Sequence, residues 1–464
     1  MLYAAVDLGG SSGRVTVGEL VNQKIVLTEL LRFKHEPVQT AEGLFWDWQF
    51  ILDQIKTGLN KATKLGEVVT LGVDSWAVDY GLIDVNGDLI APPHCYRDGR
   101  TDGVMAKLKT ELGVDYIYGK TGIQFIFFNT MYQLFVEKQS NAYQRAEKFL
   151  MVPDLINYLL CGAISTEITN ASTTQLLNVH TQDWDWELIE KLGIKKSLFP
   201  KINKPGVQVG VVKNHGGLDG IKVISVGSHD TASAVAGTPL PQGEVGAYIS
   251  SGTWSLVGLE LVKPVTDKAA MDFNITNEMG VGDQIRFIKN VAGMWLLEQS
   301  LDYWASKGEK YTAAELAKAA ALLPKASVID ANDPRFEKPG AMPERIADLC
   351  RQMNQPVPQT PAEYARCIFD SLADAYARVL TQLQTAAGVK LTSINIVGGG
   401  SANKLLNQLT ADATSLTVYA GPVEATVLGN IMVQMQSMGV IKSLSHGRQI
   451  IKDSITQEVF KPRN

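Results

Sequence analysis

The chain has 464 residues, of which 45% are hydrophobic and 20% are charged, a balance that is ordinary for globular proteins. This length exceeds what one hydrophobic core usually serves, so we expect two domains of roughly 200 residues each. The formal net charge is −5. It argues against binding to nucleic acid or to an acidic membrane, because such binders carry a basic excess.

We find no apolar run of about 20 residues and no segment with the pattern of a secretory signal, so we expect a cytoplasmic protein. The four cysteines, Cys95, Cys161, Cys350 and Cys367, show neither a C-x-x-C pair nor a zinc-ligand spacing. Four reduced thiols are therefore expected. A disulfide between Cys350 and Cys367 stays open, as does the choice between a monomer and a homodimer.

The first part of the chain predicts the beginning of an α/β domain. Three apolar runs separated by short polar turns indicate an antiparallel meander, and a helical pattern and a buried strand follow it. The expected elements are strands at 2–8, 14–20, 24–33 and 68–76 and a helix at 48–66, which ends at Gly66.

The second half of the chain repeats this plan. GTPLPQGE, 237–244, concentrates glycine and proline and is the expected linker. Segment 246–262 then predicts a second hairpin with a Ser/Gly/Thr turn, although it shares almost no residues with the first. Further expected elements are helices at 290–308, 364–388 and 422–439 and a strand, glycine turn and helix at 391–414. The alternation of strands and helices favours an α/β architecture.

The loop in VDLGGSSGR, 6–14, has the residue types that a polyphosphate needs. Glycines let backbone N–H groups approach phosphate oxygens, and small hydroxyls donate to the same oxygens. Asp7 is suited to hold Mg²⁺ through water, and Arg14 adds positive charge. A tight hairpin turn with an incidental acid fits the same residues equally well.

Two later turns are further candidates for nucleotide contacts. ISSGTWS offers Thr253, and VGGG places bare backbone and a helix N-terminus, beginning near Ala402, next to Gly399. Asn403, expected on the first helical turn, is suited to an adenine or ribose edge. The alternative for VGGG is a simple turn from strand to helix.

The strand end in VGSHDTASA delivers His229, Asp230 and Thr231 where α/β sheets place ligand chemistry. A carboxylate there suits a general base that takes the proton of an attacking hydroxyl. The alternative is that Asp230 caps the following helix. DSWAVDYG, 74–81, and HCYRDGRT, 94–101, combine aromatic and charged groups that suit a polyhydroxylated ligand, although each also fits an ordinary salt-bridged loop.

Five segments, DLGGSSGR, SHDTASA, ISSGTWSLVG, IVGGGSANKLLNQL and GPVEATVLGN, resemble in this order the FGGY carbohydrate kinases of the actin-like ATPase superfamily. The resemblance runs from residue 3 to about residue 435. It implies two actin-like (ribonuclease H-like) α/β domains, a sugar-binding domain at 1–240 and a nucleotide-binding domain at 241–464. Each is expected to hold a five-stranded mixed sheet, with ATP in the cleft between them.

The resemblance also implies roles for individual residues on the nucleotide side. The residues that would bind ATP are Gly10, Ser11, Ser12, Gly13, Arg14, Thr253, Gly399, Glu298 and Asn403. Asp7 would organise Mg²⁺. At Glu298 such kinases more often carry Gln, and a carboxylate there suits ribose hydroxyls rather than phosphates.

On the sugar side, the resemblance makes Asp230 the proton acceptor for the 1-hydroxyl of a ketose. The residues that would contact the sugar are Ala77, His229, Asp230, Thr231 and Asn290. YRDGRTDGVM, TGIQFIFFNTMYQL, TEITNASTTQLLNV, FIKN and RCIFDSLA resemble the branch of the family that phosphorylates L-rhamnulose.

Three alternatives stay open. The substrate is another ketose, such as L-fuculose or a pentulose, if the residues around Ala77, Asn129, His229 and Asn290 have a different geometry. An actin-like ATPase without a sugar substrate is a second alternative, but SHDTASA argues against it, because a base aimed at a hydroxyl has no evident purpose there. A silent sugar sensor would need Asp230 or the DLGGSSGR loop to be degraded, and both are intact.

Overall fold

The computed structural model describes residues 1–241 and 245–463, so residues 242–244 of the expected linker lie outside the described part. The chain divides into two compact units. Unit 1 comprises Met1–Pro239, Leu261–Phe287 and Ala425–Ser454, and unit 2 comprises Leu240–Glu260, Ile288–Glu424 and Ile455–Asn464. The chain first passes from unit 1 to unit 2 at the predicted boundary and later returns to unit 1 twice. The assignment of 1–240 to the sugar and of 241–464 to the nucleotide stays a prediction.

The sheet of unit 1 has six strands in the order β13-β14-β6-β1-β2-β3. Strands β1, β2 and β3 form the predicted antiparallel meander, whereas β6 and β14 run parallel to β1. The strands are β1 (Leu2–Leu8), β2 (Ser12–Val21), β3 (Lys24–Lys34), β6 (Val68–Ser75), β13 (Gln208–Val211) and β14 (Lys222–Ile224). Three parallel strands therefore end at the same edge of this sheet.

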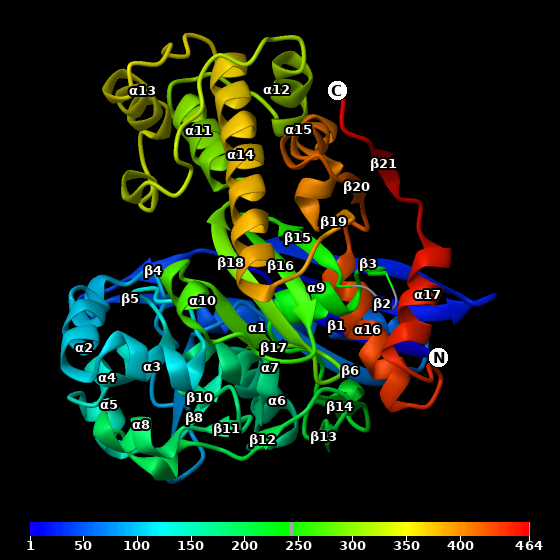
Figure 1. Cartoon of the computed structure of the whole chain (residues 1–464). Helices are drawn as coiled ribbons and strands as arrows, with labels where there is room; N and C mark the ends of the chain where they lie inside the picture. The colour runs from blue at the N-terminus through cyan, green and yellow to red at the C-terminus, as the bar shows by residue number, and fades with distance from the viewer. Residues whose placement is uncertain (242–244, 464) are drawn as a thin grey trace. The chain divides into compact units, whose positions relative to one another are not determined.

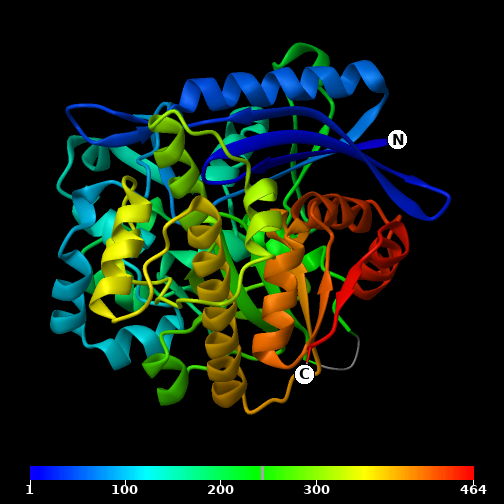
Figure 2. The same cartoon turned by 90° about the horizontal axis from the view of Figure 1, so that it is seen from above.

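Helices cover both faces of the sheet of unit 1. They are α1 (Trp48–Leu65), α9 (Asp230–Ala236), α16 (Ala425–Ser437) and α17 (Leu444–Ser454). Figure 2 shows the blue strands between the blue helix α1 on one side and the red helices α16 and α17 on the other. The apolar stripe of α1 buries Ile51, Ile55 and Leu59, Asp47 caps the helix start, and Gly66 follows its end as predicted. Periodicity thus predicts this helix well because one face packs on the sheet.

Glycines allow α9 and α16 to touch backbone to backbone. A Cβ on Gly429 would lie 1.8 Å from the carbonyl oxygen of Ser233, and a Cβ on Gly237 would lie 2.2 Å from the carbonyl oxygen of Ala425. Only glycine permits so close an approach. This contact fixes the helix that begins at Asp230 against a helix almost 200 residues further along the chain.

The rest of unit 1 is a mostly helical region that includes the antiparallel pair of β7 (Tyr80–Asp84) and β8 (Ala146–Met151). Its helices are α2 (Val104–Leu112), α3 (Val114–Thr121), α4 (Thr130–Glu137), α5 (Asn141–Arg145), α6 (Val152–Cys161), α7 (Ile168–Ala171) and α8 (Trp186–Lys191). The short strands are β4 (Pro37–Gln39), β5 (Leu44–Trp46), β9 (Thr166–Glu167), β10 (Leu177–Asn178), β11 (Asp183–Trp184) and β12 (Ile202–Asn203).

The second sheet has seven strands in the order β17-β18-β16-β15-β19-β20-β21. They are β15 (Ala247–Ser251), β16 (Trp254–Leu261), β17 (Thr276–Met279), β18 (Ile285–Ala292), β19 (Ser393–Val397), β20 (Thr417–Ala420) and β21 (Glu458–Phe460). Strands β15 and β16 form the predicted hairpin, and β15 runs parallel to β19. The prediction of five strands in each sheet is wrong, because short edge strands such as β13 and β21 carry too few residues for a periodic signal.

The helices of unit 2 are α11 (Trp295–Ser306), α12 (Ala313–Ala320), α13 (Met342–Gln352), α14 (Pro361–Ala387) and α15 (Lys404–Thr414). Figure 1 shows the long helix α14 beside α12 and α15, and it contacts both. The short helix α10 (Lys268–Asp272) belongs to unit 1. The four cysteines are free thiols.

Two expected helix starts are wrong. Asn290 lies in strand β18 and α11 begins only at Trp295, because IRFIKNVA alternates as a strand that is buried along most of its length. The turn at VGGG continues as a short 3-10 helix, Gly399–Ala402, and α15 begins at Lys404. Asn403 is therefore the N-cap rather than a residue of the first turn, and its side chain accepts a hydrogen bond from the Leu406 N–H at 3.1 Å.

Candidate active site

Three aspartates meet where the parallel strands of unit 1 end. Asp7 on β1 and Asp74 on β6 are register partners, so their side chains point to the same face. The next residue of β6, Ser75, pairs with His229, which directly precedes Asp230. The carboxyl ends of parallel strands are where α/β sheets place ligands. The structure therefore brings together Asp7 and Asp230, two predicted site residues that lie far apart in the sequence.

Asp74 is part of this cluster, although we did not predict a role for it by itself. Its side chain is fully buried and accepts a hydrogen bond of 2.5 Å from the Asn430 amide. Burial raises the pKa of Asp74 well above its usual value, and the charges of Asp7 and Asp230 raise it further, while Asn430 opposes the shift. The sequence places this acid near the end of the predicted strand at 68–76, but only the strand register places it next to Asp7.

The DLGGSSGR loop forms a tight turn between β1 and β2. The Gly9 N–H donates to the Ser12 carbonyl at 2.8 Å. Gly13 has no room for a side chain, because a Cβ there would lie 2.4 Å from the Phe33 ring. Arg14, for which a phosphate contact stays a prediction, forms an ion pair with Asp7, with its Nε 2.7 Å from Oδ2. Gly10 and Ser12 are half-buried and Ser11 is exposed, whereas Gly13 is buried.

Within the part of the chain that the structure describes, no group of three or more His, Cys, Asp or Glu side chains has the geometry of a metal site. Mg²⁺ needs fewer protein ligands than such a group supplies, because it usually keeps several waters and binds only one or two carboxylates. Asp7, 9% exposed at its side chain and beside a second buried carboxyl group, has the chemistry for such a water-mediated contact.

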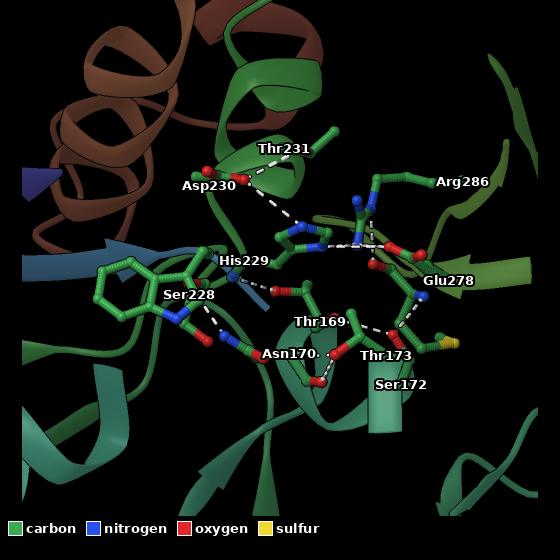
Figure 3. Close-up of polar contacts among 12 residues, drawn as sticks. Thr169, Asn170, Ser172, Thr173, Ser228, His229, Asp230, Thr231, Glu278 and Arg286 are labelled. Carbon is green, nitrogen blue, oxygen red and sulfur yellow. Dashed lines mark hydrogen bonds and ion pairs between the residues drawn. The ribbon is translucent and has the colours of Figure 1, made fainter. Parts of the chain in front are cut away.

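Asp230 begins helix α9 and is not its cap. His229 holds the N-cap position, which makes the alternative of a capping Asp230 wrong. The carboxylate accepts a hydrogen bond from Thr231 Oγ1 at 3.1 Å, and His229 Nε2 lies 3.4 Å away (Figure 3). Its side chain is 28% exposed. Burial raises the pKa of Asp230, His229 opposes this shift and Asp7 adds to it, which suits a carboxylate that takes up a proton.

A buried ion pair holds the other side of the His229 ring. Nδ1 lies 3.1 Å from both Glu278 Oε2 and Arg286 Nη2, and these two atoms are 3.0 Å apart. Figure 3 shows the ring between this pair and Asp230. Burial raises the pKa of Glu278, but Arg286 and His229 outweigh it and hold the pKa below its ordinary value. Sequence reasoning missed both residues, whose only signal is a charged residue in each of two short segments that the structure buries as strands β17 and β18.

The backbone before Asp230 is held by the segment that begins TEITNAS. Glu167 accepts hydrogen bonds from the Ser228 N–H at 3.0 Å and the Ser228 hydroxyl at 2.7 Å. The Thr169 hydroxyl accepts one from the His229 N–H at 3.2 Å. Glu167 and Thr169 are fully buried. They fix the peptide that aims His229 and Asp230.

In unit 2, the two turns predicted to contact a nucleotide lie side by side. A Cβ on Gly400 would lie 2.0 Å from Ser251 Oγ, so the VGGG turn packs directly on the end of β15. Thr253 Oγ1 donates to Glu298 Oε2 at 3.3 Å. Gly399, in the VGGG turn, is exposed, whereas Asn403 is half-buried. The structure thus groups the predicted residues of this unit at one edge of its sheet.

The remaining predicted sugar contacts lie on different structural elements and far apart in the sequence. Ala77 belongs to the turn after β6 and is half-buried, and Thr231 is buried in α9. Asn290 lies on β18 and is half-buried. Asn129 is buried and precedes α4, where its amide donates to Gln175 and to the Gln124 carbonyl, each at 2.9 Å.

Family models match both halves of the chain, the N-terminal domain of the FGGY family of carbohydrate kinases at residues 2–237 and its C-terminal domain at residues 247–438. The chain therefore belongs to the FGGY family of carbohydrate kinases. Kinases of this family take ATP, generally with a divalent metal ion, and the chain is accordingly a carbohydrate kinase.

Individual proteins that are similar to this chain include two rhamnulokinases and one xylulose kinase. The rhamnulokinase of Mannheimia succiniciproducens is 44% identical over 465 residues, covering 99% of this chain and 95% of the relative. The rhamnulokinase of Bacillus subtilis is 42% identical, covering 100% and 96%. Among solved structures, the xylulose kinase of Lactobacillus acidophilus superposes with a TM-score of 0.82 at 18% identity, covering 100% of this chain and 94% of that one. This likeness shows the fold.

No helix in the described ranges is long and apolar enough to cross a membrane.

Proposed function

We propose that the protein transfers the γ-phosphoryl group of ATP to the 1-hydroxyl of L-rhamnulose, giving L-rhamnulose 1-phosphate and ADP. The full-length identity of 40% to 44% to several proteins named rhamnulokinase supports the substrate. The observation that carries the chemistry is the half-buried carboxylate of Asp230, set between His229 and the aspartates at the strand ends.

Asp230 acts as the general base in this proposal. Its carboxylate takes the proton of the 1-hydroxyl as that oxygen attacks the γ-phosphorus, and the bond between the γ-phosphorus and the bridging oxygen of ADP breaks. The raised pKa of Asp230 increases its affinity for this proton. The surrounding residues stay in place, because Glu167, Thr169 and α16 hold the peptide and the helix that carry Asp230.

The sugar is expected to bind in unit 1, at Ala77, His229 and Thr231, with Asn290 of β18 as an amide contact. The nucleotide is expected to use the DLGGSSGR turn together with Thr253, Glu298, Gly399 and Asn403. Mg²⁺, when bound, neutralises part of the charge on the β- and γ-phosphates. In this chain Asp7 would hold the ion through water, and Arg14, which now pairs with Asp7, would be free to turn toward a phosphate oxygen.

The direct test measures ADP release by the purified protein with L-rhamnulose, L-fuculose, L-ribulose, D-xylulose and glycerol. We expect L-rhamnulose to give the highest kcat/KM. If another ketose gives a higher kcat/KM, the substrate assignment is wrong. If none of the sugars raises ATP turnover above its background, the proposed kinase reaction is wrong.

A further inference from the structure

The turn between β6 and β7 has a backbone conformation that its residues disfavour. Val78 has a φ of +67°, and the Asp79 N–H donates to the Ala77 carbonyl at 2.9 Å, which closes a three-residue turn. A β-branched residue at positive φ is an outlier, because its side chain clashes with its own backbone. Such conformations persist where the surroundings force them, and they cluster at functional sites. The turn presents Ala77, the expected backbone contact of the sugar.

Hydrogen bonds hold the carbonyl of the strained residue. Thr130 Oγ1 donates to the Val78 carbonyl at 2.7 Å, and Gln133 Nε2 lies 3.3 Å from the same oxygen. Both side chains come from the first turns of α4 and are buried. The peptide after Val78 is therefore fixed by a helix that lies more than fifty residues further along the chain.

The side chain of Asp79 is the centre of a larger network. Its Oδ2 accepts hydrogen bonds from Trp46 Nε1 at 2.7 Å, Trp76 Nε1 at 3.0 Å and the Tyr96 N–H at 3.1 Å, and its Oδ1 accepts one from Gln133 Nε2 at 3.1 Å. Asp79 is fully buried, and all four donors are uncharged groups. One carboxylate therefore ties together four segments around the turn.

The same network reaches the DLGGSSGR turn. The rings of Trp46 and Trp76 pack at 4.3 Å between centroids, and the His35 ring lies 5.3 Å and 5.4 Å from them. His35 Nε2 is 2.9 Å from the Gly9 carbonyl, and the Trp76 N–H donates to the Leu8 carbonyl at 2.9 Å. The rings that Asp79 holds thus also support the predicted phosphate turn.

We propose that Asp79 is a positioning residue for the sugar, which holds the strained turn at Val78 and so presents the Ala77 backbone to the ketose. This inference rests on the proposed function. Asp79 has no contact with the reacting atoms in it and takes no proton. An ionised carboxyl group is suited to this position because both of its oxygens accept hydrogen bonds and it carries no N–H or O–H group that would face one of the four donors.

The test is the Asp79→Asn variant, assayed with ATP and with the sugar that the wild type prefers. An asparagine keeps the volume but turns an N–H group toward donors, so the two tryptophans and Gln133 cannot all be satisfied. We expect the KM for the sugar to rise at least about 10-fold. The KM for ATP should rise less, through the rings that also support the DLGGSSGR turn, and kcat should be less affected than the sugar KM.

Asp370→Asn is the matched control, because Asp370 is also buried, at 3% side-chain exposure, and pairs with Arg366 in helix α14 of unit 2. We expect it to lower the unfolding temperature and to leave the sugar KM unchanged. Trp46→Phe is a second variant, which keeps an aromatic ring but removes the shortest hydrogen bond to Asp79 together with part of the ring contact with Trp76 and His35. It should raise the sugar KM, and the double variant should add little to Asp79→Asn, because both changes remove one shared interaction.

If Asp79→Asn and Trp46→Phe lower stability as Asp370→Asn does but leave the sugar KM unchanged, the inference is wrong. If Asp79→Asn does not fold, Trp46→Phe decides between the same two outcomes. A wild type that phosphorylates no ketose refutes the proposed function and this inference together. An active wild type with an unaltered sugar KM in the variants refutes the inference alone.

Discussion

His229 Nε2 lies 3.4 Å from Oδ1 of Asp230, the carboxylate that we propose as the general base. The opposite nitrogen of the ring contacts the buried Glu278–Arg286 pair. The ring therefore connects a fixed, buried ion pair with a carboxylate that is partly open to solvent. Its orientation is set by residues that lie outside the reaction itself.

Asp230→Asn should lower kcat at least about 100-fold, because an amide cannot accept the proton of the hydroxyl. Nucleotide binding, measured by calorimetry, should stay close to that of the wild type. A variant that keeps most of its activity would show that another group is the base.

Glu278→Gln should lower kcat by about 10-fold, less than Asp230→Asn, because His229 loses the charge that holds its ring while the base remains. Arg286 would then lie in the interior without an ionised partner, so the free energy of unfolding should fall as well. Arg286→Lys keeps the charge and is the conservative comparison. If Glu278→Gln reduces stability but leaves kcat and its pH dependence unchanged, the pair has a purely structural role.

The rate should depend on pH through Asp230. A general base works only as the carboxylate, and burial raises the pKa of Asp230 above its usual value of 3.8. Activity is therefore fully present above this raised pKa and is lost as the pH falls through it, at a higher pH than for an exposed aspartate. A profile of kcat/KM for the sugar between about pH 4 and pH 8 measures this limb. A limb at or below the usual value would contradict the assignment.

Gly429→Ala should lower the free energy of unfolding by about 1–3 kcal/mol and reduce kcat, because its Cβ would force α16 away from the helix that begins at Asp230. Chemical denaturation measures the first effect. Gly119→Ala is the control, since nothing lies within 4 Å of a Cβ there. That change in helix α3 should leave stability unchanged or raise it by about 1 kcal/mol. Equal effects of both changes would contradict the close contact of the two helices.

Thr253→Val should raise the KM for ATP and leave the KM for the sugar unchanged, because it removes the hydroxyl that donates to Glu298 in unit 2. Glu298→Gln retains an acceptor for that hydroxyl and should affect the KM for ATP less. Steady-state kinetics with each substrate varied in turn separates the two values. A change confined to the sugar KM would remove both residues from the predicted nucleotide contacts.

The sequence by itself determined the elements with strong local patterns. The meander, helix α1, the second hairpin and helix α14 follow from periodicity and from turn and cap residues, which are local properties of the chain. The candidate base was also predictable, since Asp230 lies a few residues after an apolar strand and begins a helix of small residues. The glycine turns at 9–13 and 398–400 were recognisable for the same reason.

Only the tertiary structure decided which residues surround the candidate base and the glycine turns. The neighbours of Asp7 and Asp230, namely Asp74 with Asn430, follow from the register of β1 and β6 and from the return of α16 to unit 1. The Glu278–Arg286 pair contacts His229, which lies about fifty residues earlier in the chain, and the Asp79 network joins segments that are tens of residues apart. No local pattern encodes such contacts, because burial and hydrogen-bond partners depend on which distant segments pack together.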